Sequence, residues 1–278
     1  MFQRISNTWG LMGESWEVLK QDKSLLVLPL LSGFCCLLIL ASFVIPIAFT
    51  HSWQPPSREA TDAQQVSYYG TLFLFYLCNY FVITFFYAAI IACAVRRMQG
   101  GTATVGDGLR DAAGRLPLIA GWALVSATVG LILRIIEDRS ERVGRIVAGL
   151  LGMAWTVVSY LVVPVLVIER KGPFAALKDS TAMLRRTWGE QVVGNFSFGL
   201  MFFVLALPAL ALVVLGFLTG SAVGLSLCIG VAVIYLVVLS LIQSALQGIF
   251  QAAVYLYARD GHASGFSNEL LSSAMQPK

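Results

Sequence analysis

The chain has 278 residues, of which 58% are hydrophobic and 12% are charged, and its formal net charge is +4 at pH 7. Soluble domains usually carry about 25% charged residues, so this composition excludes an ordinary soluble domain and indicates a protein that resides in lipid. We expect the lipid bilayer as its partner and no nucleic acid.

The chain opens with a segment that is amphipathic at helical spacing. Steps of three and four residues separate the apolar side chains of Phe2, Ile5, Trp9, Met12, Trp16 and Leu19. This spacing places them on one face of an α-helix, and tryptophan suits the headgroup boundary of a membrane. The sequence therefore predicts an interfacial amphipathic helix over residues 1–23.

Six apolar runs follow, and each is long enough to cross a hydrocarbon core of about 30 Å, which takes roughly 20 helical residues. They cover residues 24–48, 68–95, 116–136, 144–168, 191–218 and 222–258. Strict alternation of apolar and polar residues is missing from these runs, so helices are favoured over a closed barrel. The sequence predicts an all-α polytopic membrane helix bundle, with six transmembrane helices in three hairpins.

Weaker versions of the first amphipathic spacing precede the third and fifth runs, around Val105–Leu116 and Phe174–Trp188. We therefore expect a cytoplasmic amphipathic helix before each hairpin, within one membrane domain. The expected parts are the interfacial helix 1–23, hairpin 1 at 24–95, a helix with hairpin 2 at 96–168, a helix with hairpin 3 at 169–258, and a cytoplasmic tail at 259–278. A true internal repeat and an ordinary amphipathic lead-in to each span both explain this pattern.

A dense run of mixed charge, RIIEDRSERVGR at residues 134–145, separates the third and fourth runs. Continued as helix, it places opposite charges four residues apart in three pairs, and such pairs stabilise a helix. The pairs are Arg134 with Asp138, Asp138 with Arg142, and Glu141 with Arg145. We expect an ion-paired cap over the hairpin, and a site for an ion or a lipid headgroup is the alternative.

The fourth run carries small residues at every fourth position, namely Gly144, Ala148, Gly152 and Thr156. Small side chains at this spacing let helix backbones approach closely, so we interpret them as packing. The sixth run carries Gln243, Gln247 and Gln251 on one helical face, and Asn195 at the start of the fifth run is positioned to join them. This polar seam predicts either interhelical hydrogen bonds or the lining of a hydrophilic path.

The distribution of lysine and arginine predicts the orientation. Fourteen of the nineteen lie in the first segment, the tail and the connections after the second and fourth runs, whereas five lie on the other side. Because cytoplasmic loops are enriched in basic residues, we expect both termini in the cytoplasm of a multi-pass protein in the cell membrane. The basic helix after the fourth run is a possible contact for anionic lipid headgroups.

Several stretches together resemble a known family, in particular WEVLKQDKSLLVLPLL, RLPLIAGWALVSATVG, ERVGRIVAGLLGMAWTVVSYLVVPVLVIERKGP, LRRTWGEQVVGN and FQAAVYLYARDG. They are similar to an uncharacterised six-span prokaryotic integral membrane protein family, catalogued as a domain of unknown function. More distantly, the layout resembles the membrane domain that accompanies glycerophosphodiester phosphodiesterases. The resemblance implies a membrane protein and assigns no catalytic residue.

Catalytic signatures are missing from the sequence. The two histidines, His51 and His262, lie in loops on opposite predicted sides, and the five cysteines show neither metal-site nor redox spacing. We therefore expect no enzyme and no cofactor. Two functions remain open, transport or lipid handling through the polar seam, or a non-catalytic membrane scaffold or assembly partner.

Overall fold

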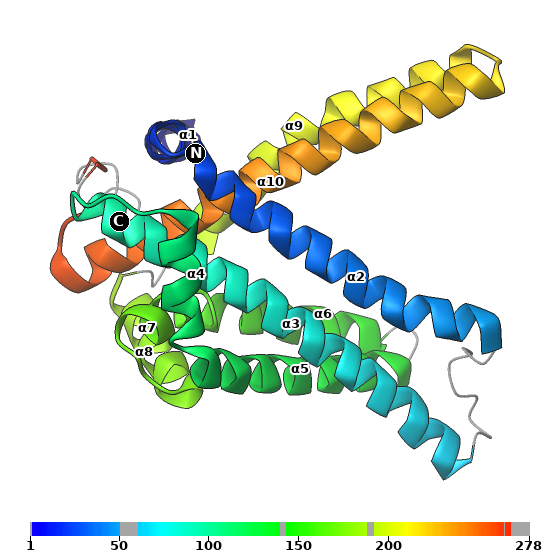
Figure 1. The fold of residues 1–278 in the computed structure, drawn as a ribbon, viewed down its shortest axis with the longest axis horizontal. Coiled ribbons are helices and arrows are strands. Elements are labelled where there is room, and N and C mark those ends of the chain that lie inside the picture. Colours follow the sequence, from blue (N-terminus) through cyan, green and yellow to red (C-terminus); the bar gives the residue numbers. More distant parts are fainter. Residues whose placement is uncertain (1, 51–60, 140–142, 188–191, 264, 268–278) are drawn as a thin grey trace. The chain divides into compact units, whose positions relative to one another are not determined.

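The computed structural model describes residues 2–50, 61–139, 143–187, 192–263 and 265–267, which are all helix, turn or loop without a β-strand. The elements shown in Figure 1 run as follows: α1 (Phe2–Gln21), the 3-10 helix η1 (Lys23–Leu26), α2 (Val27–Thr50), α3 (Asp62–Met98), α4 (Val105–Ala113), α5 (Leu116–Arg139), α6 (Val143–Val158), α7 (Val162–Ile168), α8 (Pro173–Thr187), α9 (Val192–Leu218) and α10 (Ala222–Asp260). The all-α fold expected from the sequence is confirmed.

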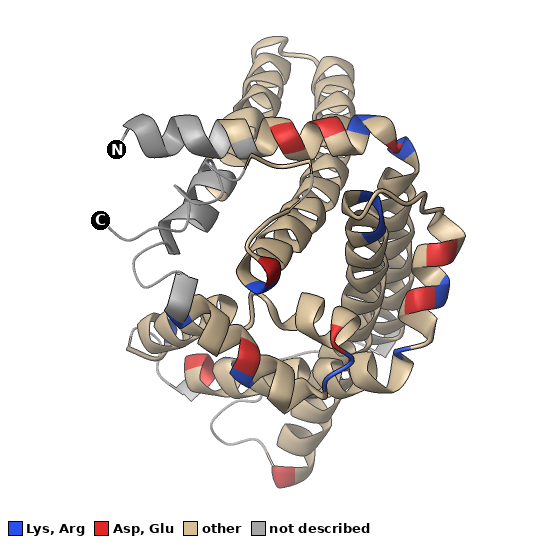
Figure 2. Ribbon diagram, turned by 90° about the vertical axis from the view of Figure 1, so that its left-hand side faces the viewer, with Lys and Arg blue, Asp and Glu red and all other residues tan. Residues whose placement is uncertain are grey.

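Six segments are long and apolar enough to cross a membrane, as the sequence predicts. They are Lys23–Pro46, Asp62–Met98, Leu116–Asp138, Val143–Ile168, Met201–Leu218 and Ala222–Asp260. Charged residues gather on α1, α4 and α8 and at the ends of the long helices, which are otherwise uncharged (Figure 2). A helix precedes α2, α5 and α9, at the places where amphipathic helices are expected, but their location at a membrane surface stays a prediction.

The described residues form two compact units. Unit 1 comprises residues of 1–29, 94–102 and 185–278, and unit 2 comprises residues of 30–93 and 103–184. Segments distant in the chain therefore fold together, because the end of α3 belongs with α1 and α10, whereas the rest of α3 belongs with α5 and α6.

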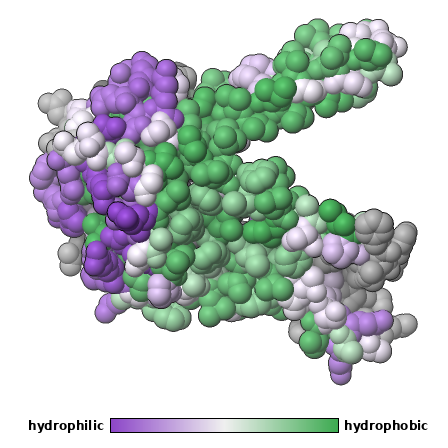
Figure 3. All heavy atoms as spheres, viewed as in Figure 1, coloured by the Kyte–Doolittle hydropathy of each residue, from purple (hydrophilic) through white to green (hydrophobic). Residues whose placement is uncertain are grey.

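In unit 1, α9 and α10 pack side by side along their length (Figure 1). The Tyr235 hydroxyl of α10 donates a hydrogen bond of 2.6 Å to the Leu205 carbonyl of α9. Hydrophobic side chains cover both helices on the face seen in Figure 3. Since an unpaired hydroxyl is costly in hydrocarbon, this bond fixes Tyr235 against its neighbour.

Helix α1 packs against α10 and α9 within the same unit. Ser15 and Leu19 of α1 are buried, whereas Trp16 is 39% exposed. The buried face of α1 therefore includes a serine, and it coincides only in part with the apolar stripe seen in the sequence. Packing against neighbouring helices decides which residues are buried here.

In unit 2, α4 approaches α3 closely. Thr104 caps α4 with Asp107 in a reciprocal capping box. A Cβ added at Gly108 would lie 2.8 Å from the Ala89 carbonyl oxygen and 2.5 Å from Cys93 Sγ, so only glycine permits this approach. Helices α5 and α6 pack together, and the rings of Trp122 and Trp155 stack between them at a centroid distance of 5.5 Å.

The fourth span departs from the sequence prediction of one helix over residues 144–168. It is broken between Val158 and Val162, where α6 ends and α7 begins. The buried Ser180 of α8 binds two backbone groups at the break. Its Oγ accepts a hydrogen bond of 3.1 Å from the Leu161 N–H and donates one of 2.7 Å to the Val158 carbonyl. Broken helices at membrane depth need such partners for the freed backbone groups.

Candidate functional site

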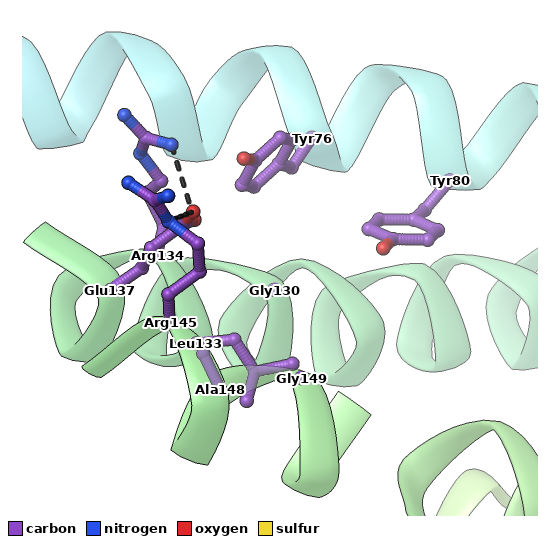
Figure 4. A pocket seen from close by; sticks show the side chains of 9 residues that line it. All are labelled: Tyr76, Tyr80, Gly130, Leu133, Arg134, Glu137, Arg145, Ala148 and Gly149. Atoms are coloured by element: carbon purple, nitrogen blue, oxygen red, sulfur yellow. Dashed lines mark hydrogen bonds and ion pairs between the residues drawn. The ribbon is translucent and has the colours of Figure 1, made fainter. Parts of the chain in front are cut away.

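One cavity of unit 2 has a wall built by α3. Tyr76 and Tyr80 are four residues apart, so they lie on the same helical face, and their ring centroids are 6.3 Å apart. Both rings reach from α3 toward α5, as Figure 4 shows. Phenol rings are apolar along their faces and polar at the hydroxyl, so this wall accepts both kinds of ligand group.

Helices α5 and α6 supply the opposite wall, and small residues keep it open. A Cβ added at Gly130 would meet the rings of Tyr76 and Tyr80 at 3.5 Å, which is ordinary contact distance. A Cβ at Gly149 would meet no atom within 4 Å. The cavity has a volume of about 460 Å³ and is lined by Tyr76, Tyr80, Gly130, Leu133, Arg134, Glu137, Arg145, Ala148 and Gly149. We call it the lateral pocket.

One end of the lateral pocket is ionic. Arg134 binds two carboxylates of its own helix, with Nη1 3.2 Å from Glu137 Oε2 and Nη2 3.1 Å from Asp138 Oδ1. Arg145 of α6 lies further out, with Nε 4.0 Å from Glu137 Oε1, and its side chain is 74% exposed. Figure 4 shows Arg134, Glu137 and Arg145 together at one end, with Tyr76 beside them and Tyr80 further along α3.

This ionic end involves part of the cap expected from the sequence. The structure contains the Arg134–Asp138 contact, and Arg145 lies near Glu137. Glu141 and Arg142 lie outside the described residues, so the two other expected pairs have no structural counterpart here. Glu137 was not singled out, although its spacing of three residues from Arg134 is a standard helical contact.

The polar seam of α10 lies in unit 1. Gln251 is buried, Gln243 and Gln247 are half-buried, and the side chain of Asn195 lies outside the described residues. The seam lines neither of the two cavities described in this section. Its use as hydrogen-bonding glue or as a hydrophilic path stays a prediction.

A second cavity, of about 380 Å³, lies in unit 1 where α1, the end of α3 and Gly265 meet. Arg97 lines it and is held by Asp22, with Nη2 2.8 Å from Oδ2. Burial opposes ionisation of Asp22, but hydrogen bonds from Ser24 and Arg97 outweigh it, so the pKa of this carboxyl lies below its usual range. The Asp22 side chain also caps η1 by accepting the Ser24 N–H.

The basic segment before α9 is partly neutralised by its own acids. Lys171 Nζ lies 2.6 Å from Glu169 Oε2 and 2.6 Å from Asp179 Oδ2. These two partners raise the pKa of the Lys171 ammonium. Arg170 and Lys178 are exposed. Contact of this segment with anionic headgroups stays a prediction, and because Lys171 is paired with two acids it rests on fewer basic groups than the sequence suggests.

Within the described part of the chain, no group of three or more His, Cys, Asp or Glu side chains is arranged to hold a metal ion. The described cysteines form no disulfide with one another, and Cys93, buried where α4 crosses α3, donates a hydrogen bond of 3.5 Å from Sγ to the Thr104 carbonyl.

Six apolar segments are long enough to cross a membrane, and their charged residues lie near the segment ends, which indicates a polytopic helical membrane protein. Residues 66–266 match the model of a family described as "Family of unknown function (DUF6159)", and the chain belongs to this family. Neither a curated protein nor a solved structure matches the chain.

Proposed function

We propose that this protein is a lipid-handling membrane protein that binds the headgroup end of a phospholipid in the lateral pocket. One observation carries the proposal: the pocket is ionic at the helix ends and aromatic or apolar further along α3 and α5. A phospholipid at the edge of a bilayer has the same order, with its charge at the surface and its apolar part below.

The surroundings of the pocket support a ligand that arrives from the bilayer. Along α6, large apolar side chains are exposed next to the pocket residues Ala148 and Gly149. They include Val143, Ile146, Leu150 and Met153, which are between 58% and 65% exposed. Exposed apolar residues on a membrane helix contact lipid chains, so the pocket is accessible to lipid without a path through water.

We also propose the membrane topology predicted from the sequence. It has three hairpins, surface amphipathic helices, both termini in the cytoplasm and insertion in the cell membrane, and the fourteen-to-five distribution of basic residues supports it. On this topology the ionic end of the pocket lies near the non-cytoplasmic surface. Labelling of a Ser140→Cys variant from outside intact cells tests it, and protection of that cysteine until the cells are opened would contradict it.

The proposal assigns the protein no chemical step, in keeping with the expectation that it is not an enzyme. It also moves the expected site from the seam on α10 to the lateral pocket, because the lateral pocket combines a cavity with charged and aromatic groups. The distant resemblance to the membrane domain beside glycerophosphodiester phosphodiesterases stays a prediction and supplies no residue to this site.

The alternative function, a scaffold or assembly partner, rests on the lack of charge pairs within the apolar runs and on their small residues, such as those of α6. A Cβ added at Gly152 would contact Leu133 Cδ1 of α5 at 3.8 Å, so this position faces the packed α5–α6 pair. This contact supports packing of the small residues between helices of the protein itself.

The test is retention of phospholipid by the purified protein, measured by native mass spectrometry. Gly149 lines the pocket and a Cβ there has open space, so the side chain of Gly149→Leu reduces the room for a ligand. Gly33→Leu on α2 is the matched control, since a Cβ there also meets nothing within 4 Å. We expect Gly149→Leu to lose bound lipid and Gly33→Leu to retain it. Equal retention by both variants would refute lipid binding in this pocket.

A further inference from the structure

Helix α8 carries an exposed aromatic side chain outside the apolar segments. Phe174, in the first turn of α8, is 75% exposed, and the side chains around it in the chain, residues 143–185, are all described. Outside the six apolar segments, the described residues leave one other large hydrophobic side chain exposed, that of Trp16, at 39%. A single exposed ring is ordinary on a protein surface, so its level in the membrane and its neighbours decide what it contacts.

The opposite face of α8 is fixed to the protein. Ala176, Ser180 and Leu184 recur at every fourth position and are buried, and Ser180 binds the break in the fourth span. Phe174 and Lys178 are also four residues apart, and both are exposed. The outward face of α8 therefore places an aromatic ring and a base one above the other.

The start of α8 lies beside the end of a membrane span. A Cβ added at Gly121 of α5 would lie 3.0 Å from Pro173 Cγ, so the first turn of α8 contacts α5 at this point. Gly121 follows Leu116, the first residue of the third apolar segment, by five positions, which is about 7.5 Å along a helix. Interfacial helices bury their apolar face about 5–10 Å into the boundary between headgroups and acyl chains. Phe174, the residue after Pro173, therefore lies at the depth at which an exposed ring contacts lipid.

Two bases flank the exposed ring. Arg170 precedes α8 and Lys178 follows one turn later, and neither forms an ion pair among the described residues, although both are exposed. The nearby acids, Glu169 and Asp179, are both bound to Lys171 Nζ at 2.6 Å. Long basic side chains can reach headgroups while an apolar neighbour lies deeper, so Arg170 and Lys178 are open to anionic phosphate.

We propose that the face of α8 defined by Arg170, Phe174 and Lys178 binds anionic phospholipid of the cytoplasmic leaflet. The ring enters the acyl boundary, and the two bases bind phosphate groups. Lipid then holds α8 from one side, and Ser180 holds it from the other. This surface is separate from the lateral pocket, and the inference depends on the proposed topology only for the leaflet that it names.

The first experiment measures the depth of residue 174. Phe174→Cys is introduced into a variant whose five native cysteines are alanine, and it carries a nitroxide label in nanodiscs of phosphatidylglycerol and phosphatidylcholine. We expect the label to collide with oxygen and to be shielded from a water-soluble nickel chelate. His262→Cys, exposed in the loop after α10, is the control and should be reached by the chelate. Equal access of the chelate at the two positions would place Phe174 in water, as for a face that binds an acidic protein, and would overturn the inference.

The second experiment measures lipid class and keeps the native cysteines. The purified protein is exposed to an equimolar mixture of phosphatidylglycerol and phosphatidylcholine with identical chains, and the retained lipids are identified by native mass spectrometry. We expect the wild type to prefer phosphatidylglycerol. The double variant Arg170→Gln with Lys178→Gln should lose about fivefold of this preference per base, the ratio that about 1 kcal/mol produces. A wild type without preference would overturn the inference.

A matched pair of bases distinguishes this face from the basic surface in general. Lys23→Gln with Arg110→Gln removes two exposed bases from other helices and should leave the preference for phosphatidylglycerol unchanged. Equal losses in the two double variants would assign the preference to basic residues at large and would contradict a site on α8.

Failure of this inference is distinguishable from failure of the proposed function. Gly149→Leu should leave the loss caused by Arg170→Gln with Lys178→Gln unchanged, because it acts on the lateral pocket. If Gly149→Leu retains as much lipid as Gly33→Leu, lipid binding in the pocket is refuted and the face of α8 is not. A reversed topology in the labelling of Ser140→Cys would contradict the assignment to the cytoplasmic leaflet.

Discussion

Asp22 and Arg97 lie 75 positions apart in the chain, yet Asp22 Oδ2 is 2.8 Å from Arg97 Nη2. Asp22 is 8% exposed and follows α1 directly, and Arg97 lies in the last turn of α3. The pair therefore ties the first helix of the chain to the end of the second membrane span within unit 1. Removal of one partner costs about 0–1 kcal/mol in an exposed pair and about 3–5 kcal/mol in a fully buried pair, and this partly buried pair lies between the two.

Asp22→Asn tests this connection. The asparagine oxygen can still accept the Ser24 N–H and cap η1, so the substitution removes mainly the charge opposite Arg97. We expect the free energy of unfolding to fall by about 2 kcal/mol, measured by thermal or denaturant unfolding of the purified protein. Because the pKa of Asp22 is lowered in the fold, this stability is present above its ordinary value of 3.8 and is lost as the pH falls through the lowered value.

Glu17→Gln is the matched control for Asp22→Asn. Glu17 also pairs with a base, Lys20 at 2.8 Å, but these side chains are 65% and 51% exposed. We expect no measurable loss of stability. Equal losses in the two variants would show that the Asp22–Arg97 pair has no special role.

Glu14 gives a pH dependence of the opposite sign. Its Oε1 accepts a hydrogen bond of 3.0 Å from the Ser267 N–H, and burial raises the pKa of the carboxyl although this hydrogen bond opposes the shift. A raised pKa in the fold contributes stability below the ordinary value of 4.5, and this contribution is lost as the pH rises through the raised value. The ionised group therefore costs stability at neutral pH.

Glu14→Gln should remove this cost while an amide oxygen remains to accept the Ser267 N–H. We expect the variant to have a higher melting temperature than the wild type at neutral pH, and the difference to vanish as the pH falls below 4.5. Melting curves across this range, with Glu17→Gln as the control for loss of a carboxylate from α1, measure it. A difference that grows as the pH falls would contradict the assignment.

Ser180→Ala tests the repair of the broken fourth span. The substitution leaves the Leu161 N–H and the Val158 carbonyl without the hydroxyl that now binds both. Since an unsatisfied buried polar group costs about 1–3 kcal/mol, we expect a loss of that size in the free energy of unfolding. Ser226→Ala is the control, because the Ser226 hydroxyl is exposed and bonds only within its own helix at 2.8 Å, to the Ala222 carbonyl.

Gly108→Ala tests the close crossing of α4 and α3. The added methyl would lie 2.8 Å from the Ala89 carbonyl oxygen, which is backbone and cannot rotate away, so α4 must shift. We expect destabilisation of about 1–3 kcal/mol. Gly106→Ala in the same helix meets only Thr104 Oγ1 at 3.7 Å and should be neutral or stabilising by up to about 1 kcal/mol, because alanine favours helix. The melting temperatures of Gly108→Ala and Gly106→Ala, each compared with the wild type, test this expectation.

Features that depend on local sequence could be predicted, and contacts between distant elements could not. Hydropathy alone locates the six spans, because each must be apolar over its whole length. The Arg134–Asp138 contact has the spacing that neighbouring turns of a helix require. In contrast, the break after Val158 depends on Ser180, and the fourth run carries no local sign of it other than Pro164.

The pocket itself was missed for the same reason. Tyr76 and Tyr80 share a helical face, and this spacing was available as a signal, but their position opposite Gly130 follows from how α3 packs on α5. Likewise, the sequence places Arg97 among the basic residues that follow the second run, and nothing near it in sequence indicates a contact with Asp22. Side-chain pairs between separate helices can be identified only once the three-dimensional structure is known.

The repaired break also has a consequence for biogenesis. Ser180 follows Leu161 by 19 residues and Val158 by 22, so the ribosome delivers the fourth span before the serine that completes it. Until α8 is synthesised and docked, the Leu161 N–H and the Val158 carbonyl lack their Ser180 partner, whereas the N–H groups of Tyr160 and Val162 are bonded to carbonyls of the same span. The hydroxyl that completes the hydrogen bonds of the fourth span is therefore translated after that span and before the last two spans.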